Sequence, residues 1–324
     1  MGSRFHEHWP RRPFGVRAWR RRPALTGADL VSVIVTTYDR TDALDAVLRA
    51  LARQTDRNFE IIVADDGSRP QTAQVVARWR SRLPVPITHV WHEHTEFRGA
   101  EIRNRAVRAS TGKLCIFLDG DCMARADFVA THRRLAEPGW FVAGNRILLS
   151  RKLTDDLLAR GTAAEAWSLA ALLRERLRGG INRLIPALRL PLGPLRKFLR
   201  RGWQGAKTCN LALARADLER VDGFDGSYVG WGLEDSDLAV RLFHAGVRRK
   251  EGRFATGVLH LWHARSDRSQ LTTNRARLEE AIRTDRVRAR RGLSSLGGDG
   301  QTCAGGTIDG SSAQHDRSPS RQDS

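Results

Sequence analysis

The 324-residue chain is 41% hydrophobic and 28% charged, which excludes a wholly disordered protein and leaves room for one large domain or two small ones. Its 55 Lys and Arg outnumber 36 Asp and Glu, and the resulting formal charge of +19 predicts an anionic partner: nucleic acid, anionic lipid or a phosphorylated substrate. No apolar run is long enough to span a bilayer, and the four cysteines show no zinc or disulfide spacing, which favours a reducing cytosol.

The two ends of the chain lack the pattern of a folded domain. Residues 1–29 hold Arg and Pro clusters without periodicity, so we predict an irregular basic arm, and no apolar stretch typical of a signal peptide is present. Residues 271–291 are predicted to form a C-terminal helix. Residues 292–324 are rich in Gly, Ser, Asp and Gln and predict a disordered tail.

The first half of the remaining chain alternates between two patterns. Short apolar, β-branched segments predict buried strands at 31–36, 59–68, 87–92 and 113–121. Amphipathic segments between them predict helices at 42–54, 71–83 and 99–110. This alternation predicts an α/β fold with a single Rossmann-like, mostly parallel sheet that is flanked by helices. The apolar face of the first helix consists of Leu44, Val47, Leu48 and Leu51.

Residues 151–203 have a different composition and predict a helical, basic insertion. Residues 154–180 show helical periodicity, whereas 181–203 contain three prolines and several Arg and Lys without an acid. One interpretation of 174–203 is an interfacial amphipathic helix that meets anionic lipid. The other is a solvated helical insertion beside a ligand cleft. The prolines argue against one long helix, and the apolar side chains that share a face near its end are Leu195, Phe198 and Leu199.

Acidic residues follow three of the predicted strands. Ligands of such sheets bind beyond the carboxyl ends of the strands, so we expect these acids to share a cleft. The D-G-D sequence at 119–121 offers two carboxylates, which hard divalent cations bind together with diphosphate oxygens. The alternative is an ordinary Asp-Gly turn. The acids concerned are Asp39, Asp65, Asp66, Asp119 and Asp121.

A second acidic cluster lies at 229–246, in the sequence VGWGLEDSDLAVRLFHAG. Acids in a first helical turn favour the helix dipole, and Asp237 can pair with Arg241 one turn later. We assign Asp237 to this structural role and expect Leu238 and Leu242 in the core, with Gly246 ending the helix. Glu234 and Asp235 have the same structural interpretation, with a site role as the alternative.

Four motifs, at 31–40, 61–68, 97–122 and 221–246, together resemble those of a family 2 glycosyltransferase with the GT-A fold. The last resembles a C-terminal segment of galactosyltransferase-type enzymes, and the resemblance covers about residues 30–265. It implies a GT-A domain at 30–270 that moves a sugar from a nucleotide-diphosphate sugar, usually a UDP-sugar. The acceptor would be a glycan, a polysaccharide or a lipid-linked molecule, and the enzyme cytoplasmic or peripheral on the inner face of the cell membrane.

The resemblance also implies roles on the donor side, with Mn²⁺ or Mg²⁺ as the cofactor. Asp121 would be a direct metal ligand, and Asp119 a ribose contact or second ligand. His263 would complete the metal site, with His260 as the alternative. The implied nucleotide-sugar-binding residues are Thr37, Asp39, Asp66, Arg103, Asp119, Asp121 and Asn210.

On the acceptor side, Asp235 would be the general base of an inverting displacement, since a fixed carboxylate can take the proton of an attacking hydroxyl. Glu234 would contact sugar hydroxyls, Trp231 would form a sugar platform, and Gly230 and Gly232 would let the loop approach the ligand. The alternative is a basic nucleic-acid- or membrane-binding protein on the same scaffold without activity. No nucleic-acid motif is recognisable, so no nucleic-acid partner is expected.

Overall fold

The computed structural model describes residues 26, 28–199, 202–264 and 266–297. Most of the predicted basic arm and most of the predicted tail therefore lie outside the described residues. Among the described helices, none combines the length and apolar character needed to cross a membrane.

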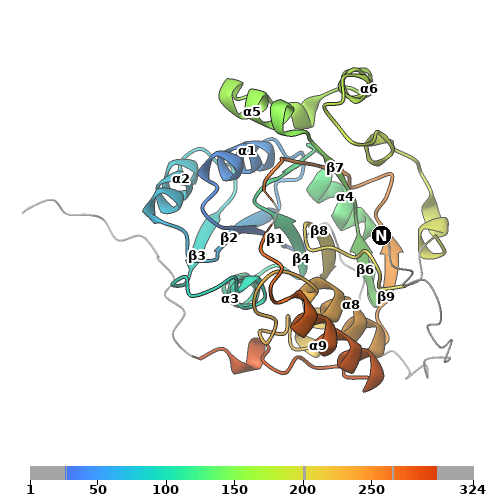
Figure 1. The fold of residues 1–324 in the computed structure, drawn as a ribbon. Coiled ribbons are helices and arrows are strands. Elements are labelled where there is room, and N and C mark those ends of the chain that lie inside the picture. Colours follow the sequence, from blue (N-terminus) through green and yellow to red (C-terminus); the bar gives the residue numbers. More distant parts are fainter. Residues whose placement is uncertain (1–25, 27, 200–201, 265, 298–324) are drawn as a thin grey trace, which may run out of the picture.

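A seven-stranded sheet forms the centre of the molecule (Figure 1). Its neighbours pair in parallel except at β8, which runs antiparallel to both β4 and β6. The predicted mostly parallel sheet is thus confirmed. In spatial order the strands are β3 (Ile87–Trp91), β2 (Phe59–Asp65), β1 (Val31–Thr37), β4 (Leu114–Asp119), β8 (Asn210–Ala214), β6 (Trp140–Ala143) and β9 (Arg248–Glu251).

Helices cover both faces of this sheet, because successive strand residues point to opposite sides. Val31, Val33 and Val35 join one core cluster, while Ile34 joins the other. The first cluster includes residues of α1 (Thr41–Ala52), α2 (Pro70–Arg80) and α4 (Phe128–Leu135). The second includes residues of α3 (Gly99–Ala109), α7 (Arg215–Arg220) and α8 (Glu234–His244). The predicted apolar face of the first helix is confirmed as buried.

A second sheet, which the sequence pattern did not predict, has three strands. β10 (Val258–His260) runs antiparallel to β5 (Cys122–Ala124) and parallel to β7 (Arg146–Leu148). The register places His260 opposite Cys122. A late segment of the chain is therefore brought beside the D-G-D turn, which ends one residue before β5.

The insertion differs from its prediction. The predicted helix over 154–180 is wrong, because α5 (Arg151–Arg160) ends at Gly161 in the left-handed conformation and α6 (Leu169–Leu177) starts anew after the turn η1 (Ala164–Ala166). A continuous helix over 174–203 is also wrong. Proline is the second residue of both of the short turns there, η2 (Ile185–Ala187) and η3 (Gly193–Lys197).

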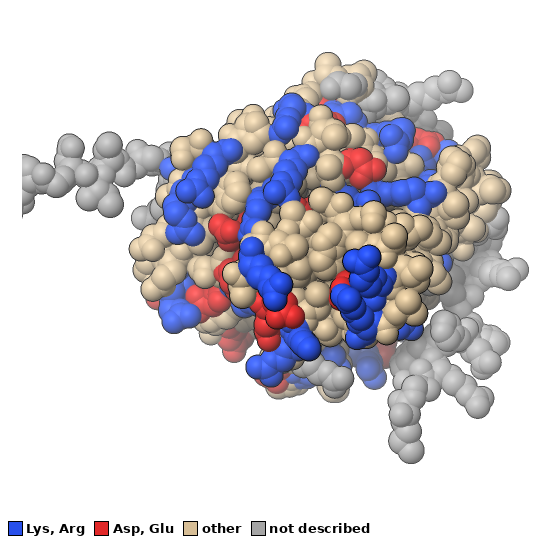
Figure 2. Space-filling model, turned by 90° about the horizontal axis from the view of Figure 1, so that it is seen from above, with Lys and Arg blue, Asp and Glu red and all other residues tan. Residues whose placement is uncertain are grey.

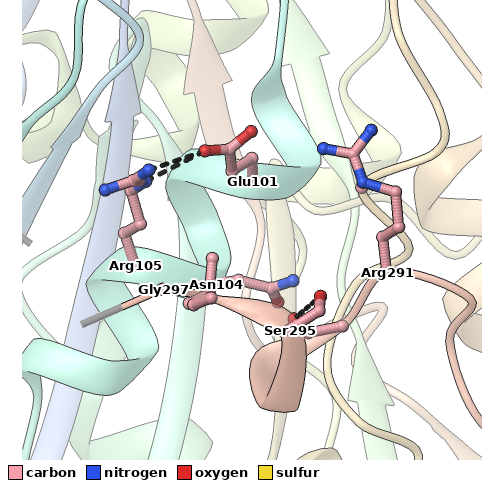
Figure 3. Close-up of a pocket in the computed structure, with 9 residues that line it drawn as sticks. Glu101, Asn104, Arg105, Arg291, Ser295 and Gly297 are labelled. Atoms are coloured by element: carbon pink, nitrogen blue, oxygen red, sulfur yellow. Dashed lines mark hydrogen bonds and ion pairs between the residues drawn. The ribbon is translucent and has the colours of Figure 1, made fainter. Parts of the chain in front are cut away.

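The C-terminal helix is shorter than predicted and the predicted tail is partly ordered. Helix α9 (Leu271–Arg283) stops eight residues early, and the chain continues through the turn η4 (Leu293–Ser295). Arg108 of α3 donates to the carbonyls of Leu296 and Gly297 at 2.9 and 3.0 Å. Figure 3 shows the small pocket, about 170 Å³, that remains between α3 and this segment. Residues 292–297 thus belong to the fold.

Candidate active site

The acids of the D-G-D turn lie beyond the carboxyl end of β4, beside the end of β1. The Gly120 N–H donates to the Thr36 carbonyl at 2.7 Å. A Cβ atom on Gly120 would come within 2.9 Å of that oxygen, so glycine permits this close approach.

Arg103 joins this turn to the second acidic cluster. Its guanidinium lies 3.5 Å from Asp119 Oδ1 and 3.2 Å from Glu234 Oε1, and its Nε donates to Thr36 Oγ1 at 3.1 Å. The ring of Phe224 lies 5.6 Å from the guanidinium carbon. The resemblance implied that Arg103 lies near the donor. In the structure this buried cation lies between the carboxylates of Asp119 and Glu234.

Asp119 is electrostatically unusual. Burial raises the pKa of its carboxyl to about 6, with repulsion from Asp121 acting in the same direction and attraction to Arg103 opposing it. Its Oδ1 atom accepts no hydrogen bond. A buried carboxylate oxygen of this kind is suited to an incoming cation or hydroxyl group.

Asp121 faces two imidazoles. His260 Nε2 lies 3.5 Å from its Oδ1, and His263 Nε2 lies 3.5 Å from its Oδ2. Burial lowers the pKa of His260, which favours the neutral form that binds metals. Carboxylates with a neighbouring imidazole fit Mn²⁺ better than Mg²⁺, because nitrogen is the softer donor. The residues present therefore fit the predicted metal, and both candidate histidines remain candidates.

Asp235 lies at the start of α8, behind a loop with unusual backbone geometry. Gly230, Gly232 and Leu233 all have positive φ, of 72°, 108° and 77°. A Cβ on Gly230 would meet the Gln270 side chain at 2.7 Å. The two glycines therefore allow a sharp turn that delivers Asp235 to the site side of the helix end.

Lys207 is the main site residue that the sequence analysis missed. Its Nζ lies 3.2 Å from Asp235 Oδ2 and 3.3 Å from Oδ1. Partial burial disfavours its charge, but attraction to Asp235 outweighs this and raises the pKa of Lys207. No spacing rule links a loop lysine to an acid 28 residues later, so the sequence contained no usable signal.

Asp237 has the structural role that was predicted. It is fully buried, and it binds Arg241 at 2.7 Å and Arg286 at 2.9 Å. The Tyr228 hydroxyl donates to it at 3.3 Å. The remaining structural predictions for this helix are also confirmed: Leu238 and Leu242 are buried, and Gly246 follows the helix with φ 83°.

Trp231 is 36% exposed at the rim of the same loop. The Arg268 guanidinium carbon lies 4.8 Å from the centroid of its ring. The ring is thus accessible but carries an arginine on one face. A sugar could use that face only if Arg268 moved aside, or it could pack against the remaining exposed surface.

The residues predicted to meet the nucleoside lie around the ends of β1 and β2. Thr37 is buried and its Oγ1 has no hydrogen-bond partner. Asp39 has a positive φ of 47°, and its carboxylate accepts hydrogen bonds from the backbone N–H and the Nε of Arg69. Asp66 is buried and accepts from His92 Nε2 at 2.7 Å and from the Arg98 N–H at 3.0 Å. Direct contact between Asp66 and a base therefore requires the loop at 92–98 to shift.

A further ring pair lies beside these residues and was not singled out from the sequence. Tyr38 and His94 stack with their centroids 4.5 Å apart. Tyr38 is 42% exposed, which makes it the accessible aromatic surface at the end of β1.

Asn210 does not fit its predicted contact with a donor sugar. Its side chain is buried and accepts from His132 Nε2 at 3.0 Å. Its amide donates to the carbonyls of Asn145 and Thr256. Because every polar atom of the side chain is used inside the protein, Asn210 joins β8 to neighbouring loops and is removed from the ligand-binding residues.

Solved structures identify the fold. A mannosyltransferase from Pyrobaculum calidifontis, in complex with GDP-Man and Mn²⁺, is similar with a TM-score of 0.52, at 21% identity, over 83% of this chain and 68% of that one. GalNAc-T7 with UDP, GalNAc and Mn²⁺ is similar with a TM-score of 0.55, at 16% identity, over 78% of this chain and 48% of that one. The chain has the GT-A glycosyltransferase fold.

Sequence comparison identifies the family. The model described as "Glycosyl transferase family 2" matches residues 32–180, and one described as "N-terminal domain of galactosyltransferase" matches 197–264. The chain therefore carries a glycosyl transferase family 2 domain, followed by a galactosyltransferase-type segment that begins within the insertion.

Curated relatives are longer than this chain. Validoxylamine A glucosyltransferase from Streptomyces hygroscopicus subsp. jinggangensis is 33% identical over 248 residues, which are 72% of this chain and 56% of that protein. Chondroitin synthase from Pasteurella multocida is 26% identical over 237 residues, 67% of this chain and 23% of that protein. The chain thus spans about half of the first relative and less of the second.

Proposed function

We propose that the chain transfers a sugar from a nucleotide-diphosphate sugar, a UDP-sugar, to a glycan, polysaccharide or lipid-linked acceptor, with inversion at the anomeric carbon. One observation carries the proposal. Two carboxylate groups, Asp119 with Asp121 and Glu234 with Asp235, lie on either side of the buried Arg103. Such a transfer needs acids at two places, one for the departing diphosphate and one for the acceptor proton.

The acceptor side would work through Asp235. As an acceptor hydroxyl attacks the anomeric carbon, the carboxylate takes its proton, and the bond from that carbon to the diphosphate oxygen breaks. Glu234 would hold a sugar hydroxyl while Arg103 fixes its orientation. Trp231 would supply an apolar surface for a sugar ring.

The donor side would hold Mn²⁺ or Mg²⁺ through Asp121 and His263, with His260 as the alternative histidine and Asp119 as second ligand or ribose contact. The metal would neutralise the charge that develops on the departing diphosphate. Thr37, Asp39 and Asp66 would surround the nucleoside, after the shift of the loop at 92–98 noted above.

Lys207 would act on the base rather than on the sugar. Its ammonium lies 3.2 Å from the Asp235 carboxylate and holds that side chain in place. Its side chain is about half exposed, so it can leave the carboxylate when an acceptor hydroxyl takes its place. We therefore assign Lys207 as a positioning residue.

The test is nucleotide release from a panel of nucleotide sugars, with Mn²⁺ and with EDTA. We expect release from a UDP-sugar that EDTA abolishes, loss of transfer in Asp235→Asn and retained donor binding in that variant. Asp155→Asn, an exposed acid of α5, is the matched control. Full activity of Asp235→Asn would remove the base assignment, and EDTA-resistant activity would remove the metal.

The alternative, a nucleic-acid- or membrane-binding protein without activity on this scaffold, is supported by the charge of +19. It predicts no nucleotide release from any donor. Localisation in the cytoplasm at the inner face of the membrane is likewise a proposal.

A further inference from the structure

Exposed apolar side chains concentrate in one part of the molecule. Of the twelve large hydrophobic residues that are exposed among the described residues, eight lie in the insertion between 169 and 199. Single exposed hydrophobics are normal, but such a cluster indicates a binding surface. The eight are Leu169, Leu173, Leu177, Ile185, Leu190, Leu195, Phe198 and Leu199.

Helix α6 presents its apolar stripe outward. Leu169, Leu173 and Leu177 recur every four residues and so lie on one face, and they are 46%, 46% and 80% exposed. The helix buries only Leu172. Packing against the rest of the protein therefore leaves most of the apolar surface of α6 uncovered.

The second part of the surface is held out by a buried arginine. Arg196 lies inside and donates to the carbonyls of Glu251 at 3.0 Å and Leu190 at 2.8 Å. These bonds fix the turn η3 to the end of β9. Leu195 and Phe198 are consequently held toward solvent, where they are 60% and 59% exposed.

The charge around these side chains is strongly positive. Residues 169–199 contain six Arg and one Lys against a single acid, Glu175. Two acids from outside the segment, Asp127 and Glu137, pair with Arg189 and Lys197, which still leaves a positive excess. Arg174 and Arg176 project from α6 and make no ion pair among the described residues. Figure 2, which views the molecule from the side of α5 and α6 in Figure 1, shows Lys and Arg side chains spaced between broad uncharged areas.

We propose that residues 169–199 form a docking surface for an anionic lipid bilayer. The leucines and Phe198 would enter the head-group region, and Arg174 and Arg176 would meet lipid phosphates. A second copy of the chain would bring the same positive charge against itself. A nucleic acid would match the arginines but leave the apolar side chains in water, so an anionic bilayer fits both features.

The surface is fixed to the edge of the candidate active site. The Gly180 carbonyl accepts from the Ser150 N–H at 2.8 Å, and the neighbouring Leu149 N–H donates to the His260 carbonyl at 2.9 Å. His260 belongs to β10 and faces Asp121. Docking of the insertion would thus bring the candidate active site to the membrane interface, and this consequence, a lipid-linked acceptor, rests on the proposed function.

The experiment is flotation of the full chain with phosphatidylcholine vesicles that contain or lack phosphatidylglycerol. We expect binding to the anionic vesicles that weakens with salt. The triple variant Leu173→Ser, Leu177→Ser, Phe198→Ser should bind at least about tenfold more weakly, because the apolar contacts are lost. The pair Arg174→Gln, Arg176→Gln should weaken binding mainly at low salt. Leu148→Ser, an exposed leucine outside the surface, should bind as the wild type does.

Equal binding by the triple variant and the wild type, or no preference for anionic vesicles, would overturn the proposal. So would a dimer in solution that the triple variant dissociates, since a second copy would then be the occupant. Far-UV circular dichroism shows whether each variant folds. Vesicle binding is measured without a donor and nucleotide release without vesicles, so failure of the surface and failure of the proposed transferase can be told apart.

Discussion

Asp235 and Asp237 lie two residues apart in the first turn of α8, and both are buried, yet their ion-pair partners differ. Asp237 is fully enclosed by Arg241, Arg286 and Tyr228. The partner of Asp235, Lys207, is about half exposed. The comparison shows that the type of residue does not separate a structural acid from a chemical one. What separates them is whether the partner can leave.

The largest expected effect is on Asp235. Replacement by Asn keeps the shape but removes the proton acceptor, so transfer should fall by about 10² to 10⁴-fold. The measurement is nucleotide release at saturating donor, with thermal unfolding alongside. Lost activity at an unchanged melting temperature would distinguish Asp235 from the structural acid Asp237. A large loss of stability would make Asp235 a structural acid too.

Asp237→Asn should do the reverse. Removal of one member of a buried ion-pair group leaves Arg241 with an unpaired charge and should lower the free energy of unfolding by about 3–5 kcal/mol. Urea denaturation measures this loss. Activity per folded molecule should stay within a few-fold of wild type. A large loss of turnover in fully folded protein would contradict the assignment of Asp237 to a structural role.

Lys207→Met tests whether the ammonium positions Asp235. Without its ion-pair partner the carboxylate is no longer held in place, so kcat should fall by about tenfold while the KM for the donor changes little. Lys207→Arg should retain activity, because it keeps a cation beside the carboxylate. A wild-type kcat in Lys207→Met would mean that Lys207 does not position Asp235.

The smallest effect concerns Asp119. Its pKa, raised to about 6 from 3.8, means that the metal-free folded protein holds a proton that the unfolded chain has lost. The contribution of this group to stability therefore falls as pH rises between these values. Because protons compete with the cation, Mn²⁺ should raise the melting temperature more at about pH 7 than at about pH 5. Asp119→Asn should reduce that difference and leave the part that the imidazole ligand contributes, and an equal difference in wild type and variant would exclude Asp119 as a ligand.

A feature could be predicted from the sequence when the contacts that form it are local in the chain, and not when they are distant. The strands from Val31 to Asp119 and their helices follow from local periodicity, and so does the pair formed by Asp237 and Arg241. The second sheet was missed because β10 pairs with strands more than a hundred residues earlier. Asn210 was misassigned for the same reason, since nothing near it in the chain reveals His132 opposite.

The insertion shows a different limit. Its periodicity predicts helices, but Gly161 and the prolines divide it into short pieces whose ends periodicity alone does not show. Arg196 is buried although it is charged, because carbonyls at and just after the end of β9 accept its hydrogen bonds. Such partners become known only when the fold is known.

The central claim, a single displacement assisted by Asp235, is tested most directly by the anomer first released when water replaces the acceptor. Proton NMR of an α-linked UDP-sugar that the enzyme accepts can follow this before mutarotation. The account predicts that the β-anomer appears first in the wild type and that its release is lost in Asp235→Asn. Initial release of the α-anomer would contradict it, because retention needs a different arrangement of groups.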